Sequence, residues 1–111
     1  MKKSIMDLSP LTESTFYILL SVKEENHGYG IIKTVEKLTE GRLKLAPGTL
    51  YGALQNLLRH KCIVITCIDE SHKNKKQYLI TDVGNKLLMY EVKRISGMLN
   101  HSKQMGVDLN D

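Results

Sequence analysis

The chain has 111 residues, of which 41% are hydrophobic and 25% are charged, a composition typical of one soluble globular domain. It contains no run of about 18 apolar residues, and its N-terminus has no apolar stretch long enough for a signal peptide. We therefore expect no membrane partner and a cytoplasmic location.

Positive charge is concentrated in the middle of the chain. The formal net charge is +4, and residues 27–63 contain six Lys or Arg but only two Glu. Residues 71–78 add three Lys and no acidic residue, whereas residues 1–26 contain three Lys and four acidic residues. This distribution favours a polyanionic partner for the central part of the chain.

The first predicted helix begins at Ser9-Pro10, because serine can cap a helix and proline is favoured in the first turn. Gly28 is expected to end this helix in the left-handed conformation. Its apolar stripe, spaced as in a helix, includes Leu11, Ile18, Leu19 and Val22.

The second predicted helix runs from about Tyr29 to Glu40, and Gly41 is placed to stop it. Residues 42–45 alternate polar and apolar side chains, which predicts a very short strand or an extended linker. The buried stripe of this helix is expected to be Ile31, Ile32, Val35 and Leu38.

The third predicted helix opens at Pro47, where the missing N–H of proline has no helical partner to lose. Its apolar side is formed by Leu50, Leu54, Leu57 and Leu58. The opposite face is small, polar and free of acidic residues, and consists of Gly48, Thr49, Gly52, Gln55, Asn56 and Arg59.

A two-stranded hairpin is predicted next. Residues 63–68 are rich in β-branched side chains, residues 69–76 form a polar turn, and residues 77–81 run back. The turn carries Lys73, Lys75 and Lys76. Lysines at an exposed hairpin tip can lie along a nucleic-acid backbone and release its counterions.

The two cysteines are expected to be free. Cys62 and Cys67 are five residues apart along a predicted extended segment, a span of roughly 16 Å. A disulfide requires Cα atoms within about 7 Å. Control of the protein by oxidation of one of these thiols is an alternative.

A long final helix is predicted from Thr81 or Asp82 to about residue 104. Leu88, Val92, Ile95 and Leu99 follow one another at intervals of four, three and four, as in a coiled coil. A helix of this length extends about 30 Å, which is more than one small core can cover, so a second subunit is expected to bury the seam. The predicted organisation is a DNA-binding domain at 1–81, a dimerisation helix at 82–104 and a flexible tail at 105–111.

Three helices followed by a basic hairpin predict a mainly α (α+β) fold, the winged helix-turn-helix. In this fold the third helix enters the major groove, which is about 12 Å wide. Gly48 and Gly52 would let the backbone come close to DNA, and Gln55 and Asn56 can each donate to and accept from base edges.

The chain also resembles the short PadR-like transcriptional regulators over roughly residues 11–100. The resemblance rests on His27-Gly28-Tyr29-Gly30-Ile31, on Pro47-Gly48-Thr49-Leu50-Tyr51 with Leu54 and Leu57, on Lys75-Lys76-Gln77-Tyr78, and on Thr81-Asp82-Val83-Gly84.

The resemblance implies that Tyr29 contacts the DNA backbone, that the Pro47 turn with Tyr51 sits on the operator, and that the first and last helices form a homodimer. It also implies a repressor with a small-molecule inducer. The sequence departs from the family in two ways. First, lysine stands at positions 75 and 76, where arginine is frequent in the family, and this favours phosphate contact over base readout. Second, some members of the family hold flat molecules between tryptophans, whereas this chain has no Trp, which argues against that mode of ligand sensing.

These arguments give two sets of candidate residues. The DNA-binding candidates are Tyr29, Lys44, Pro47, Gly48, Thr49, Tyr51, Gly52, Gln55, Asn56, Lys73, Lys75 and Lys76. The dimerisation candidates are Leu11, Ile18, Leu88, Val92, Ile95 and Leu99.

Catalysis, a metal site and a cofactor are not expected. The four histidines share no ligand spacing, neither cysteine lies in a zinc pattern, and no glycine-rich phosphate loop follows a predicted strand. The alternative function is a protein–protein adaptor built on the winged-helix scaffold.

Overall fold

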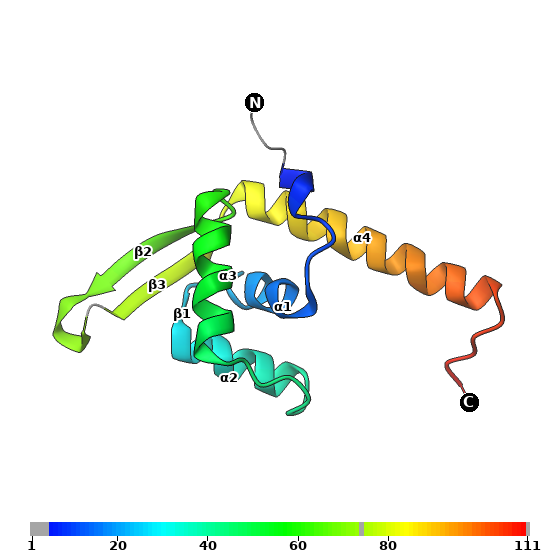
Figure 1. Cartoon of the computed structure of the whole chain (residues 1–111), viewed down its shortest axis with the longest axis horizontal. Helices are drawn as coiled ribbons and strands as arrows, with labels where there is room; N and C mark the ends of the chain where they lie inside the picture. Colours follow the sequence, from blue (N-terminus) through cyan, green and yellow to red (C-terminus); the bar gives the residue numbers. More distant parts are fainter. Residues whose placement is uncertain (1–4, 74, 111) are drawn as a thin grey trace.

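A computed structural model describes residues 5–73 and 75–110 (Figure 1). Its elements are η1 (Ile5–Leu8), α1 (Glu13–Ser21), β1 (Asn26–His27), α2 (Gly28–Leu38), α3 (Pro47–Arg59), β2 (Ile63–Asp69), η2 (Glu70–His72), β3 (Lys75–Ile80) and α4 (Asp82–Gln104). The predicted mainly α (α+β) winged helix-turn-helix is confirmed. Asn74 of the predicted turn, Asp111 of the predicted tail and residues 1–4 lie outside the described residues.

The first helix is shorter at both ends than predicted. Thr12, not Ser9-Pro10, caps it: the Thr12 hydroxyl oxygen accepts a hydrogen bond from the Thr15 N–H at 3.2 Å. The helix ends at Ser21, and Gly28 begins α2 instead of stopping α1. The segment between them turns extended because it joins the sheet.

The second helix ends at Leu38, two residues before the predicted Glu40, and the chain leaves it through two left-handed residues, Glu40 at φ +51° and the predicted Gly41 at φ +80°. Ile31 and Val35 are fully buried, whereas Leu38, expected in the same stripe, is 53% exposed because it lies beyond the helix's contact with the core. Residues 42–45 form an extended linker without a strand.

The third helix supplies the centre of the core. Pro47 begins α3 as predicted, and Leu50, Leu54 and Leu57 are buried while Leu58 is half-buried. The remaining core comes from every other layer of the molecule: Ile18, Leu19, Val22, Ile31, Val35, Leu45, Cys62, Ile63, Tyr78, Ile80, Leu87 and Leu88.

The sheet has three antiparallel strands in the order β1-β3-β2, one more than the predicted two-stranded wing. The added strand β1 pairs Asn26 with Tyr78 and His27 with Gln77. β2 and β3 form the wing, which projects from the helices in Figure 1. Both cysteines at this wing are free as predicted; Cys62 is buried, which raises its thiol pKa, and Cys67 is exposed.

The fourth helix begins on the body of the protein and then leaves it (Figure 1). The Thr81 hydroxyl oxygen caps it by accepting from the Gly84 N–H at 3.1 Å. A Cβ atom at Gly84 would collide with the Cys62 carbonyl oxygen, so the helix start touches the backbone that precedes β2. No helix in the described part of the chain has the length and apolar character needed to cross a membrane.

Two residues predicted to face a second subunit lie inside the protomer instead. Ile18 is fully buried and Leu88 is only 6% exposed. α1 carries Ile18 into the central core, and Leu88 lies on the turns of α4 that still pack against the body.

One buried carboxylate joins α4 to the chain ahead of α1. Glu91 is fully buried and accepts hydrogen bonds from the Ser9 hydroxyl and the Leu11 N–H, both at 2.6 Å. Arg94 donates to it from Nε at 2.8 Å and from Nη2 at 3.0 Å. Mainly through the Arg94 hydrogen bond, the pKa of Glu91 falls from 4.5 to about 2.

We predict that Glu91→Gln lowers the free energy of unfolding by about 3 kcal/mol, because it removes one partner of a buried ion pair. The folded-state pKa lies below the unfolded value, so the carboxylate stabilises the fold above about pH 4.5 and loses that effect as the pH falls toward about 2. Urea denaturation across this range should show the wild-type and variant curves converging at low pH. Glu24→Gln, at an exposed loop residue, is the control; a constant gap between wild type and Glu91→Gln at every pH would contradict the prediction.

Candidate nucleic-acid interface

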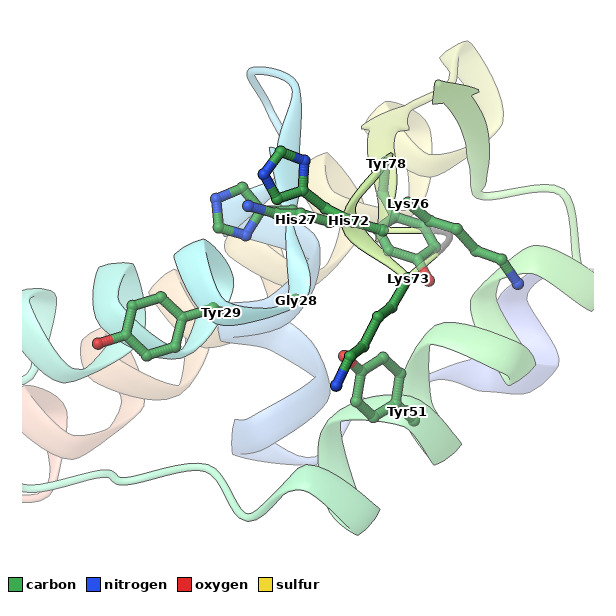
Figure 2. A pocket seen from close by; sticks show the side chains of 9 residues that line it. His27, Gly28, Tyr29, Tyr51, His72, Lys73, Lys76 and Tyr78 are labelled. Atoms are coloured by element: carbon green, nitrogen blue, oxygen red, sulfur yellow. The ribbon is translucent and has the colours of Figure 1, made fainter. Parts of the chain in front are cut away.

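A cleft of about 430 Å³ lies between the wing and the beginnings of α2 and α3 (Figure 2). It brings together three tyrosines and three lysines from segments that are far apart in the sequence. The lining residues are His27, Gly28, Tyr29, Tyr51, His72, Lys73, Lys75, Lys76 and Tyr78. Because none of these side chains is acidic, the cleft combines positive charge with hydrogen-bond donors.

Tyr51 reaches this cleft because residue 28 has no side chain. A Cβ atom at Gly28 would lie 2.6 Å from the Tyr51 hydroxyl oxygen and 3.2 Å from the adjacent ring carbon. Gly28 is buried while Tyr51 is 53% exposed, so the tyrosine covers the first turn of α2 and keeps its outer edge in solvent.

His27 holds the beginning of α2 in place. Its Nδ1 accepts a hydrogen bond from the Gly30 N–H at 3.1 Å, which requires this nitrogen to be unprotonated. Burial, and then the charge of Lys75, lower the pKa of His27, so the imidazole is neutral near pH 7. His27 therefore acts as a structural cap at the edge of the cleft.

The beginning of α3 is open to solvent. Ala46 precedes the helix and provides no side-chain cap, and the first turn contains no acidic residue. Gly48 and Thr49 are exposed, and nothing lies within 4 Å of a Cβ atom placed at Gly48 or Gly52. A free helix N-terminus of this kind offers N–H groups and the positive end of the helix dipole to an anion.

Asp69, one of the two acidic residues at the wing tip, is hydrogen-bonded within its own turn. The Asp69 carboxylate accepts from the Ser71 N–H at 3.0 Å and hydroxyl at 2.6 Å, and lies 2.8 Å from His72 Nδ1. These bonds hold Asp69 against its own turn. The hydrogen bond from Ser71, and after it the one from His72, lower the pKa of Asp69. Lys73, Lys75 and Lys76 are exposed.

The structure gathers most of the predicted DNA-binding residues on one side. Tyr29 is 63% exposed, and the Lys33 ammonium lies 5.3 Å from its ring centroid. Lys44 is exposed on the linker before α3 but does not line the cleft, and Asn56 is half-buried. A second hollow of about 350 Å³ continues along α3 and is lined by Tyr51, Gly52, Leu54, Gln55, Leu58, Lys76 and Tyr78.

Sequence reasoning did not select Tyr78 or His27 as site residues. Tyr78 was noted only as part of a family motif, and only 5% of it is exposed. Alternation along β3 was the available signal: Lys76, Tyr78 and Ile80 share one face of the strand, so Tyr78 lies on the same side as a lysine of the wing.

Residues 18–89 match the model of the transcriptional regulator PadR-like family. The transcriptional regulator YqjI of Escherichia coli (strain K12) is 36% identical over 62 residues, which make up 56% of this chain and 28% of that protein. The match thus spans little more than a quarter of that relative.

Solved structures share the fold. A transcriptional regulator from Clostridium thermocellum gives a TM-score of 0.73 at 21% identity, covering 86% of this chain and 93% of that one. Bacillus subtilis PadR in complex with operator DNA gives a TM-score of 0.64 at 25% identity, covering 75% of this chain and 48% of that one. Bordetella bronchiseptica BpsR, whose DNA binding is regulated by 6-hydroxynicotinic acid, gives 0.64 at 17% identity, covering 92% and 71%.

We predict that Gly28→Ala moves Tyr51 out of the cleft without unfolding the protein. The added methyl group meets the far end of a half-exposed side chain, which can swing aside, so the loss of stability should stay within about 1 kcal/mol. The ring signals of Tyr51 in NMR spectra should shift, and those of Tyr90 should not. Gly48→Ala, with open space around it, is the control; an unshifted Tyr51 ring in Gly28→Ala would contradict the predicted contact.

Proposed function

The chain belongs to the PadR-like family of transcriptional regulators, and from this premise we propose that it binds a palindromic operator as a homodimeric, ligand-responsive repressor. The observation that carries the proposal is the cleft between wing and helices, with three lysines, two exposed tyrosines and no acidic side chain in its lining. The solved complex of Bacillus subtilis PadR with operator DNA supports it. As a transcriptional regulator, the protein would act in the cytoplasm.

In the proposed complex α3 enters the major groove. Gly48 and Gly52 allow the helix backbone to approach the DNA, and the exposed Gln55 can pair with a base edge. The open N–H groups of the first turn face a phosphate. Lys73, Lys75 and Lys76 would then follow the backbone of the flanking minor groove, contributing affinity that depends on salt.

α4 supplies the proposed dimer interface. Beyond Glu91 the helix leaves the body, and Val92, Ile95 and Leu99 are 49%, 39% and 43% exposed. Leu11, half-buried ahead of α1, lies beside a hollow shared with Ile95. A second copy packed along this strip would bury it and would set the two α3 helices at a fixed separation, about 34 Å for successive major grooves.

An inducer would act on this dimer by binding better to one arrangement of the two α4 helices than to another, which misaligns the α3 helices. The regulation of Bordetella bronchiseptica BpsR by 6-hydroxynicotinic acid supports a small-molecule signal in this fold.

We predict that changing Lys73, Lys75 and Lys76 together to Gln weakens binding to DNA from upstream of the chain's own gene. The slope of log Kobs against log salt concentration should become shallower by about 2–3, because each lost phosphate contact releases about one counterion fewer. Fluorescence anisotropy over a salt series measures both quantities. The control removes the same charge elsewhere, at the exposed Lys37, Lys86 and Lys103; an equal loss there would mean that net charge alone matters. A wild-type protein that binds no DNA would favour the adaptor function.

We predict that Val92→Glu combined with Ile95→Glu yields a folded monomer, because two charges would be buried in the dimer seam. Sedimentation velocity gives the mass, and circular dichroism gives the helix content. Leu38→Glu, at a similarly exposed apolar residue of α2, should leave the dimer intact. A double variant that still sediments as a dimer would place the interface outside α4.

A further inference from the structure

Tyr78 has an unusual position in the cleft. Only 5% of Tyr78 is exposed, yet the residue lines both hollows beside α3. Every fully buried side-chain polar atom in the described residues has a hydrogen-bond partner, and within residues 5–73 and 75–110 the Tyr78 hydroxyl makes no hydrogen bond. The ring is therefore packed in the core, and the hydroxyl is the part that reaches the cleft.

The Tyr78 hydroxyl faces a matching group across the cleft. Figure 2 shows the Tyr51 hydroxyl beside the tip of the Lys73 side chain, and the Tyr78 hydroxyl pointing from the wing toward α3. Burial, and then the neighbouring Tyr51, raise the pKa of Tyr78, so its hydroxyl keeps the proton and can donate. At about 430 Å³ the cleft far exceeds the ~30 Å³ of one water molecule, so it can admit a larger group together with solvent.

The chemistry of the lining selects an anion with several acceptor oxygens. The hydroxyls of Tyr51 and Tyr78 and three ammonium groups can donate, the Nδ1 of His27 is already used to cap α2, and no carboxylate is among the lining residues. We propose that the hydroxyls of Tyr51 and Tyr78 together hold one phosphate group of the DNA backbone where the strand passes between α3 and the wing. This assignment rests on the proposed function and adds to it a fixed contact point with named donors.

The two kinds of donor have different consequences. The lysines are flexible point charges that attract many phosphates and release counterions. The tyrosines are neutral, and Tyr78 is held rigidly by the core, so their hydrogen bonds fix where one phosphate lies without contributing to counterion release. The register of α3 on the bases then depends on Tyr78, whereas the salt dependence of binding depends on the lysines.

The test replaces each hydroxyl singly, with Tyr51→Phe and Tyr78→Phe, and leaves both rings in place. The probe is a DNA duplex selected by the wild-type protein from a random pool. Each variant should lose about tenfold in affinity, as expected for a hydrogen bond to a charged group, with an unchanged salt slope. Tyr90→Phe on α4, 46% exposed and outside the cleft, is the matched control and should bind like wild type. Thermal unfolding verifies that all three variants remain folded.

Ethylation interference on the same duplex identifies the phosphate. In each half-site, ethylation of one phosphate should block binding of the wild-type protein. Ethylation of that same phosphate should not weaken binding of Tyr78→Phe further. If the wild-type protein binds the duplex and Tyr78→Phe binds it with the same affinity, the assignment is overturned while the proposed function stands. Calorimetry measures the binding of inorganic pyrophosphate. If Tyr78→Phe loses pyrophosphate binding but keeps its DNA affinity, the assignment is also overturned, because the cleft would then hold a free phosphate compound. Failure of the wild-type protein to bind any duplex would refute the proposed function itself and, with it, the assignment.

Discussion

β3 is hydrogen-bonded along both of its edges, and this pairing determines where the wing stands relative to the helices. On one side it pairs with β2 from Ile63 to Asp69, and on the other with the two residues of β1. At its end the Ile80 N–H donates to the Val22 carbonyl at 2.8 Å, which ties β3 to the end of α1. Since β1 runs directly into α2, the same bonds that fix the wing also fix the beginning of α2, and the cleft between them has a defined width.

Glycines in this chain have two opposite roles. At Gly28 and Gly84 another part of the molecule occupies the space that a side chain would need: the Tyr51 hydroxyl in one case and the Cys62 carbonyl in the other. At Gly48 and Gly52 the space is empty. A glycine inside a helix costs stability relative to alanine, up to about 1 kcal/mol. No contact among the described residues accounts for that cost at Gly52, whereas the close approach of a DNA strand in the proposed complex would.

Local patterns in the sequence were sufficient for most of the helices and for the wing. The helical stripe of α3, the left-handed conformation of Gly41 and the cap at Thr81 depend on residues close together in the chain, and these predictions are confirmed. Gly28 was misassigned because a helix stop and a close packing contact require the same residue type, and only the distant Tyr51 distinguishes them. Strand β1 was missed because two residues carry no alternation. The position of Tyr78 beside Tyr51 in the cleft and the burial of Glu91 likewise depend on partners more than twenty residues away.

The start of α4 links the proposed dimer interface to the proposed DNA-binding surface. The Thr81 hydroxyl donates to the Lys61 carbonyl at 2.6 Å, the Thr81 N–H donates to the Cys62 carbonyl at 2.9 Å, and Gly84 packs against that same carbonyl. The backbone at Lys61 and Cys62 is the junction between α3 and β2. A tilt of α4 imposed by a second subunit or a ligand must therefore displace either this junction or these bonds. Packed contacts of this kind resist continuous deformation, so in the proposed dimer a change of angle between the two α4 helices would pass to α3 and the wing as a rigid movement. Glu91, one turn beyond the buried Leu88, binds the chain ahead of α1 to the same rigid unit, so the N-terminal segment would move with it.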